Sequence, residues 1–365
     1  MNRTLRNISN IGQLAQEKHV TRASLKGDIG DQAGAARRGA LVDRRNTRSV
    51  KLNQEVAKKS EVKKIVRATI AKKHEKSVST KEKLRKKERS YTDARFNTVV
   101  IQCDEYKEDV ENYIFYLEKH FDSVGAEFLL GSEISPKMRA ILVDWLVQVH
   151  ARYRLLPETL FLTIDILDRY LAKGLATKKM LQLIGVAALS AASKYEEIFP
   201  PEIVEYVYIT ENALNRADVI RMEYKVLSVV DVTLGRPTVI QFLRRISTYF
   251  NQTVHIMAKF ISENMVVDYK TCHLNPSLIA ATSVWLAAVL DGRSFPPVLY
   301  RFARVSKEKI CEVAPTAAAH LLEMQKSTRL VGIKEKYSGL LNAQFRQEHV
   351  ALLRSIVDGD LEGLT

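Results

Sequence analysis

The sequence has few of the features that mark extracellular, membrane or metal-binding proteins. Its 365 residues include only 3 Cys, and Cys103, Cys272 and Cys311 stand far apart without any CxxC pair. This argues against a disulfide framework and a zinc site, and favours a reducing compartment. No apolar run approaches the ~20 residues that span a bilayer, and no apolar signal segment follows Met1. We therefore expect a protein of the nucleus and cytoplasm with no membrane partner.

Motifs that carry enzymatic chemistry are also missing. There is no GxxxxGK[ST] or GxGxxG loop for phosphates, no HExxH motif, and no kinase or Ser/His/Asp signature. His150, His255 and His273 stand singly, where a structural histidine is the commoner case. Glu196 and Glu197 are adjacent, so on a helix they point about 100° apart and cannot form a facing acid and base. We expect neither catalysis nor a cofactor.

Positive charge is concentrated in the first hundred residues. The formal net charge is +14, and residues 1–100 hold 26 Lys and Arg against 10 Asp and Glu, whereas the remainder holds 30 against 32. This leader lacks Trp and has few periodic apolar positions, so it cannot bury enough surface to offset the entropy of ordering. We predict a disordered basic leader over residues 1–95. Residues 56–89 are a candidate transient helix, nuclear import signal or nucleic-acid contact, with a solvated lysine-rich tail as the alternative.

After the leader, apolar residues recur at helical spacing. Region 96–134 is predicted to contain an amphipathic N-terminal helix, with apolar positions at Tyr106, Val110, Tyr113, Ile114, Leu117 and Phe121. Five helices are then predicted, over 137–151, from Pro157, over 178–195, over 202–209 and over 217–230. Ser135 and Pro136 form the expected start of the first of these five, because Ser caps a helix and Pro suits its first position.

The helical pattern lapses at Leu234-Gly235-Arg236, and five similar stretches follow. The middle helix of each half, Met180 to Lys194 and Ser277 to Asp291, is apolar almost all round and rich in small residues, as expected of a buried central helix. We predict an all-α protein with two five-helix repeats over 135–232 and 233–350 and a C-terminal tail over 351–365.

The segment MRAILVDW, residues 138–145, resembles the cyclin family, and specifically the mitotic B-type cyclins. The resemblance continues through RLLPETL, IDILDRYL, KKMLQLIGVAALSAASKYEEIFPPEI and RMEYKVL, and persists more weakly through LGRP to near Lys336. It implies tandem cyclin boxes that bind and activate a cyclin-dependent Ser/Thr kinase to drive the G2/M transition. The cyclin itself would be no enzyme, because it acts by positioning elements of the kinase.

The resemblance also assigns roles to individual residues. All five signature positions of the family are present: Arg139, Asp168, Leu183, Lys194 and Glu223. Arg139 and Asp168 would form a structural ion pair between the first two helices of the box. The implied kinase-binding residues are Lys194, Tyr195, Glu196, Glu197, Glu223, Leu227 and Leu234. Without the resemblance, Lys194 and Glu223 would be interpreted as ordinary surface charges.

A second implied surface is a patch that docks Arg-x-Leu motifs of substrates. Its residues would be Met138, Ile141, Leu142, Trp145, Gln148, Leu181 and Gln182. On periodicity alone, the stripe from Met138 to Trp145 fits core packing equally well. Gln148 stands where A-type cyclins carry an acidic residue, which suggests weaker docking of such motifs because a charge-assisted partner is replaced by an amide.

The leader contains a candidate destruction signal. Arg38, Leu41 and Asn46 fit the spacing RxxLxxxxN, which in mitotic cyclins is recognised by the anaphase-promoting ubiquitin ligase and leads to proteolysis. A second RxxL at 22–25 is weaker because Gly30 occupies its ninth position.

A transcription factor IIB-like nucleic-acid-binding adaptor is the alternative, since it shares the twin-box fold. It should show a zinc ribbon and basic box surfaces. The sequence shows neither, so we expect no direct nucleic-acid contact.

Overall fold

The structure, a computed structural model, describes residues 106–211, 213–339 and 347–360. The predicted leader, with residues 56–89 and the candidate destruction signal at Arg38, Leu41 and Asn46, lies outside the described residues. All regular secondary structure in the described ranges is helical. The prediction of an all-α fold is confirmed. No helix among the described residues is long and apolar enough to cross a membrane.

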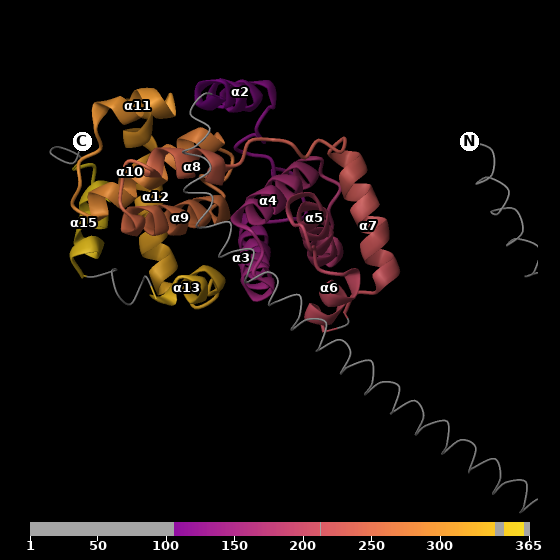
Figure 1. Cartoon of the computed structure of the whole chain (residues 1–365). Helices are drawn as coiled ribbons and strands as arrows, with labels where there is room; N and C mark the ends of the chain where they lie inside the picture. Colours follow the sequence, from indigo (N-terminus) through magenta and orange to yellow (C-terminus); the bar gives the residue numbers. More distant parts are fainter. Residues whose placement is uncertain (1–105, 212, 340–346, 361–365) are drawn as a thin grey trace, which may run out of the picture. The chain divides into compact units, whose positions relative to one another are not determined.

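The first repeat contains five α-helices and one short 3-10 helix (Figure 1). They are α3 (Pro136–Tyr153), α4 (Pro157–Ala172), η2 (Lys178–Met180), α5 (Leu181–Glu196), α6 (Ile203–Ile209) and α7 (Arg216–Val229). The start of α3 is as predicted: the Ser135 side chain accepts a hydrogen bond from the Met138 amide, and Pro136 is the first helical residue. The helix ends at Tyr153 and is followed by Arg154, which has a left-handed backbone with φ of 52°.

The second repeat follows the same order of helices. Its members are α8 (Val239–Ser247), α9 (Gln252–Val267), α10 (Pro276–Leu290), α11 (Pro297–Ala303) and α12 (Lys307–Lys326). The middle helix α10 is buried over nearly its whole length and contacts the other four helices, and α5 contacts the other four α-helices of the first repeat. The predicted pair of central helices is thus present.

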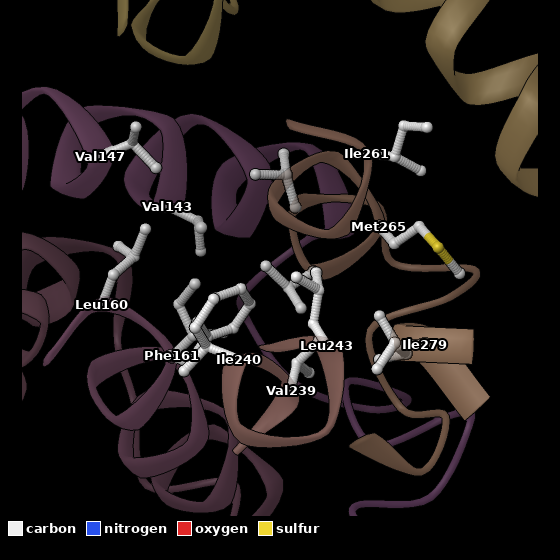
Figure 2. Close-up of a cluster of buried hydrophobic side chains, with 14 of the residues drawn as sticks. Val143, Val147, Leu160, Phe161, Val239, Ile240, Leu243, Ile261, Met265 and Ile279 are labelled. Carbon is white, nitrogen blue, oxygen red and sulfur yellow. The ribbon is translucent and has the colours of Figure 1, made fainter. Parts of the chain in front are cut away.

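The buried side chains of both repeats form one hydrophobic cluster. Figure 2 shows Val143 and Phe161 of the first repeat close to Ile240 and Leu243 of the second. The two repeats therefore share one hydrophobic core and are not two units with separate cores.

The N-terminal helix, α2 (Lys107–His120), packs on the second repeat by a face that the apolar pattern shows only in part. Of the predicted positions on this helix, Ile114 and Leu117 are half-buried. Its buried residue is Phe115, whose ring lies 5.0 Å from that of Phe242 in α8. By contrast, Tyr106, Val110 and Tyr113 have exposed fractions of 58%, 52% and 60%. The docked face includes polar contacts, such as the Glu111 ion pair with Arg245, so spacing of apolar residues alone could not identify it.

Two helices follow the second repeat. The short helix α13 (Gly332–Lys336) packs on α3, and α15 (Gln347–Val357) packs on α12 with Leu353 and Ile356 buried. The predicted boundary at residue 350 falls inside α15. This segment is a packed helix because its two buried residues are three apart and share one face.

Candidate partner-binding surfaces

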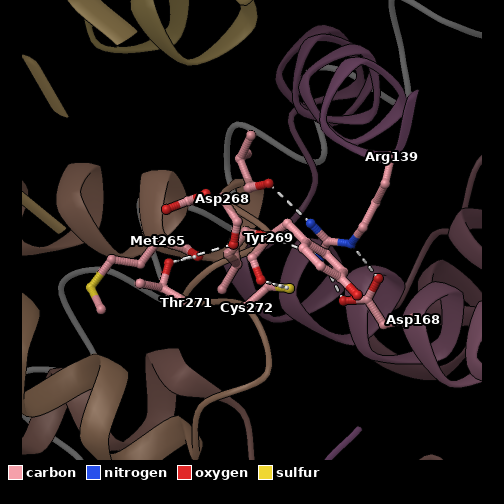
Figure 3. Close-up of polar contacts among 9 residues, drawn as sticks. Arg139, Asp168, Met265, Asp268, Tyr269, Thr271 and Cys272 are labelled. Carbon is pink, nitrogen blue, oxygen red and sulfur yellow. Dashed lines mark hydrogen bonds and ion pairs between the residues drawn. The ribbon is translucent and has the colours of Figure 1, made fainter. Parts of the chain in front are cut away.

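Arg139 forms the centre of a buried polar network (Figure 3). Its side chain is fully buried and makes two parallel hydrogen bonds to Asp168 of α4, with Nε and Nη2 each 2.6 Å from a carboxylate oxygen. The same guanidinium donates to the carbonyls of Val266 and Val267 at the end of α9, over 2.9 and 3.0 Å. The resemblance implied that Arg139 and Asp168 join two helices of one repeat. In the structure, Arg139 also bonds to the second repeat through the end of α9. Four hydrogen bonds satisfy a charge that burial would otherwise penalise.

Lys194 and Glu223 lie side by side on α5 and α7. Lys194 Nζ donates to Glu223 Oε1 over 2.5 Å, and the hydroxyl of Ser190 donates to Oε2 over 3.1 Å. The side chain of Lys194 is 47% exposed, whereas that of Glu223 is 10% exposed. The buried Ser190 hydroxyl thus helps to fix the Glu223 carboxylate, whereas the Lys194 side chain remains about half exposed to solvent.

Three more of the predicted kinase-binding residues come from the same two helices and from the linker after α7. Tyr195 is 54% exposed, and its hydroxyl lies 3.3 Å from where a Cβ on Gly235 would be, so the inter-repeat linker passes beside it. Leu227 and Leu234 are half-buried. The contacts of Lys194 with Glu223 and of Tyr195 with Gly235 bring the end of α5 beside α7 and beside the linker that carries Leu234.

Helix α7 and the segment after α5 also expose large apolar side chains that the sequence analysis did not assign. Ile198 is 74% exposed, Ile220 45% and Tyr224 77%. On α7, the spacing of Ile220, Tyr224 and Leu227 places them on one stripe of the helix. This spacing is the sequence signal by which they could have been assigned to a surface. We define the α5–α7 face as Lys194, Tyr195, Ile198, Ile220, Glu223, Tyr224, Leu227 and Leu234.

Glu196 and Glu197 have different environments despite their adjacency. Glu197 Oε1 accepts hydrogen bonds from the Leu156 amide, over 2.6 Å, and from the Thr159 hydroxyl, over 2.7 Å, so it caps the start of α4. Glu196 has a pKa raised to about 7, first by burial and then by the nearby carboxylates of Glu158 and Glu197. Glu197 is therefore an internal capping group, and Glu196 carries a charge that its surroundings disfavour.

The predicted docking patch is only partly a surface. Ile141 is 47% exposed, Met138 and Trp145 are half-buried, and Gln182 is exposed. Leu142 and Leu181, however, are 6% and 7% exposed and belong to the core. Their burial argues against the docking role that the resemblance implies for these two leucines. Leu142 packs against Gly185 of α5, where a Cβ would come within 3.0 Å of its Cδ1, so the two helices approach closely there.

Asp144, in the middle of the same motif, has a role that the sequence analysis missed. It is 3% exposed and accepts hydrogen bonds from the amides of Val331, Gly332 and Ile333, at 2.9 to 3.4 Å. Its carboxylate thus caps α13 and holds it on α3. Gln148, one turn on, donates to the same carboxylate over 3.4 Å. No local pattern reveals contacts between residues almost 190 positions apart.

Over the described residues, no group of three or more His, Cys, Asp or Glu side chains could hold a metal ion.

Comparisons with known proteins agree with this geometry. The family model for the cyclin N-terminal domain matches residues 112–235, and that for the cyclin C-terminal domain matches residues 237–354. This chain belongs to the cyclin family. The break between the two matched domains falls at the predicted lapse in the helical pattern, beside Gly235.

Among its relatives are mitotic B cyclins. The chain is 40% identical to the G2/mitotic-specific cyclin-B of Patella vulgata over 64% of this chain and 58% of that protein. It is 40% identical to the G2/mitotic-specific cyclin-B1 of Oryzias latipes over 71% of this chain and 64% of that protein. The matched part of this cyclin thus spans less than two thirds of these relatives. The predicted likeness to B-type cyclins is confirmed, and the IIB-like alternative is not favoured.

A solved structure supports the fold. The X-ray structure of a viral cyclin from herpesvirus saimiri matches with a TM-score of 0.51 at 18% identity, covering 63% of this chain and 97% of that one. The predicted tandem cyclin-box fold is confirmed.

Proposed function

We propose that this cyclin is a regulatory subunit that binds and activates a cyclin-dependent kinase at the G2/M transition. The observation that carries the proposal is the α5–α7 face, where exposed apolar side chains surround an ion pair that is already formed. Exposed apolar clusters rimmed by polar groups mark protein interfaces. Tyr224 and Ile198, with exposed fractions of 77% and 74%, would become buried on binding. Membership in the cyclin family and the B-type relatives support a cyclin-dependent kinase as the partner.

The mechanism would be positional. A kinase segment seated on the α5–α7 face would meet apolar contacts from α7 and a charged pair able to bond its backbone, since Lys194 has three donors and Glu223 accepts. The αC helix of the kinase would be pushed inward, so that its glutamate reaches the lysine of its β3 strand. The cyclin provides no reacting atom and acts as no enzyme itself.

The test is histone phosphorylation by a purified cyclin-dependent kinase with the full chain added. We expect strong activation by the wild type, and at least a tenfold loss for the double variant Ile220→Ala, Tyr224→Ala, because apolar anchors at an interface commonly contribute over ~1 kcal/mol each. The matched control is Tyr208→Ala, which removes a tyrosine that is 64% exposed from α6, outside this face. Full activation by the double variant would contradict the proposal.

We further propose that the part of the docking patch that is exposed receives substrate segments. Met138, Ile141 and Trp145 form an apolar stripe on α3 that is separate from the α5–α7 face. Activation of the kinase and recruitment of substrates would then be separable by mutation. Trp145→Ala should weaken phosphorylation of docked substrates while leaving activity on a short peptide substrate intact.

The leader supports a proposal about turnover and location. Arg38, Leu41 and Asn46 would deliver the protein to the anaphase-promoting ubiquitin ligase, and the basic leader would favour entry into the nucleus from the cytoplasm. The variant Arg38→Ala, Leu41→Ala should persist after anaphase in synchronised cells, where the wild type disappears. Equal decay of both forms would refute this role.

A further inference from the structure

The chain that leaves α7 has a backbone that its residues do not favour. Asp231 and Val232 both have left-handed dihedrals, with φ of 52° and 53°. Residues other than glycine rarely adopt this region, and for a β-branched residue such as valine it is a clear outlier. The Val232 side chain is 64% exposed, so its own burial offsets little of this cost. The two left-handed residues therefore depend on contacts made by the rest of the segment.

Arg169 of α4 makes such contacts on both sides of the left-handed pair. Its Nη2 donates to the carbonyl of Val230 over 2.8 Å, and its Nη1 donates to the carbonyl of Thr233 over 2.7 Å. The Arg169 side chain is 15% exposed. A planar guanidinium can join two acceptors in one fixed geometry, and its charge strengthens both hydrogen bonds. Arg169 thus spans the turn by binding the residue before the pair and the residue after it.

The far end of the same segment is also attached to α4. Asp165, one turn before Arg169, accepts a hydrogen bond from Arg169 over 3.3 Å. It also forms an ion pair with Arg236, over 3.4 Å. Arg236 in turn donates to the carbonyl of Asp122, over 2.6 Å. Residues 230–236 are therefore held on α4 at both ends.

Two residues between these attachment points lie at the α5–α7 face. Leu234 is a member of that face, and a Cβ on Gly235 would be 3.3 Å from the hydroxyl of Tyr195. The backbone has only two soft dihedrals per residue, so a change from left-handed to right-handed dihedrals redirects the chain that follows. The place of Leu234 beside Tyr195 therefore depends on the turn at residues 231–232.

We propose that Arg169 is a positioning residue for the α5–α7 face, because it holds the left-handed turn after α7 and thereby fixes Leu234 where a partner meets it. The guanidinium acts through the backbone of residues 230–233 and does not itself touch the partner. This inference rests on the proposed function, in which the partner is a cyclin-dependent kinase. It adds a residue of α4, a helix that contributes no member of the face.

The experiment measures the dissociation constant between the full chain and a purified cyclin-dependent kinase by surface plasmon resonance. The temperature is one at which circular dichroism shows every variant to be folded. We expect Arg169→Gln to raise the dissociation constant about tenfold, as the loss of one interface anchor does. Arg169→Lys should raise it about threefold, because an ammonium group keeps the charge but lacks the planar fork. The control is Asp144→Ala, which removes the cap of α13 and should leave this constant unchanged.

A double-mutant cycle tests whether Arg169 acts through the turn. Glycine adopts left-handed dihedrals without the cost that valine bears, so Val232→Gly should make Arg169 less necessary. In the Val232→Gly background, we expect Arg169→Gln to raise the dissociation constant by less than about threefold. The cycle cancels any direct contact of Val232 with the kinase, because that side chain is absent from both members of this background. If Arg169 contributed to stability alone, it would change none of these constants once the chains are folded.

The outcomes separate this inference from the proposed function. The positioning role is overturned, while kinase binding stands, if Arg169→Gln binds as tightly as the wild type or loses equal affinity in both backgrounds. An equal loss for Asp144→Ala would overturn it too, since general destabilisation would then be the cause. If Arg169→Gln does not fold, Arg169→Lys replaces it in the cycle, and its loss should disappear in the Val232→Gly background. If the wild type does not bind the kinase, or if Ile220→Ala, Tyr224→Ala binds as tightly as the wild type, the proposed function itself is overturned.

Discussion

Lys194 and Glu223 are paired in the free chain, with 2.5 Å between the ammonium nitrogen and the carboxylate oxygen. Glu223 is further fixed by Ser190, so its position does not depend on Lys194. Lys194 keeps donors that point to solvent, because an ammonium group has three. The charged centre of the α5–α7 face is therefore organised before any partner arrives, which reduces the entropy lost on binding.

This arrangement predicts that Lys194→Ala separates stability from function. The lysine side chain is about half exposed, so its loss should lower the free energy of unfolding by less than ~1 kcal/mol. Kinase activation should fall at least tenfold, since a donor at the centre of the proposed interface is removed. Thermal denaturation and the histone assay measure the two effects. The control is Lys225→Ala, which removes an exposed lysine of α7 outside the face and should change neither stability nor kinase activation. If Lys194→Ala lowered stability enough to account for the lost activity, Lys194 would have a structural role only.

The docking of α2 gives a second pair of matched substitutions. Phe115 is 6% exposed, packs against Phe242, and carries the guanidinium of Arg304 over its ring at 4.4 Å. Phe115→Ala should cost about 3 kcal/mol, from lost burial and a cavity. Tyr113, two residues earlier, is 60% exposed, and Tyr113→Ala should cost under ~0.5 kcal/mol. Urea denaturation of the full chain measures both, and similar costs would mean that α2 does not dock through Phe115.

Sequence predicted the helices well where local signals exist. The predicted helix over 137–151 is observed as α3, Pro136–Tyr153, because a serine cap and a proline mark its start. The two central helices were predictable since an all-round apolar helix can only be buried.

Features that depend on partners distant in the sequence were not predictable in the same way. The burial of Leu142 depends on Gly185 in another helix, and the face by which α2 docks depends on residues of α8. Periodicity shows that a helix has an apolar side but not which neighbour covers it. The Lys194 and Glu223 site was identified only through resemblance to a family, because single charges on separate helices carry no local signal.

Glu196 predicts a dependence of stability on pH. Its pKa of about 7 in the folded chain lies above the ordinary glutamate value, so the folded state holds this proton more tightly than the unfolded state. Its contribution to stability is therefore full at low pH and is lost as the pH rises through 7. This loss begins near the unfolded pKa of 4.5. Glu196→Gln removes the charge and should leave stability unchanged near pH 4.

At pH 8 the same Gln variant should exceed the wild type by about 1 kcal/mol, a figure reduced for solvent screening at a half-exposed side chain. Melting temperatures at both pH values test this. Asp218→Asn, at the start of α7, provides a comparison away from the acidic cluster. An equal gain at pH 4 and pH 8 would show that titration of Glu196 is not the cause.

Gly332 is the position where the C-terminal segment contacts α3. We expect that adding a single methyl group there will lower the stability of the fold. A Cβ there would collide with the backbone carbonyl of Asp144 and lie 2.8 Å from Cγ of Gln148. The contacting atom belongs to the backbone of α3, which cannot move as a flexible side chain can. Gly332→Ala should therefore lower the free energy of unfolding by about 2 kcal/mol, because it displaces α13. Gly339→Ala is the control, because nothing lies within 4 Å of its Cβ position, and it should be neutral or stabilising by a few tenths of a kcal/mol.

A double-mutant cycle then tests whether the clash and the cap act on the same docking event. Asp144→Ala removes the acceptor of three amides and should itself cost about 2 kcal/mol. If α13 is released by either change, the double variant should cost little more than the larger single cost, with a coupling energy above ~1 kcal/mol. Simple additivity in denaturant unfolding would mean that Asp144 stabilises α3 by another route, and that the seating of α13 does not depend on its carboxylate.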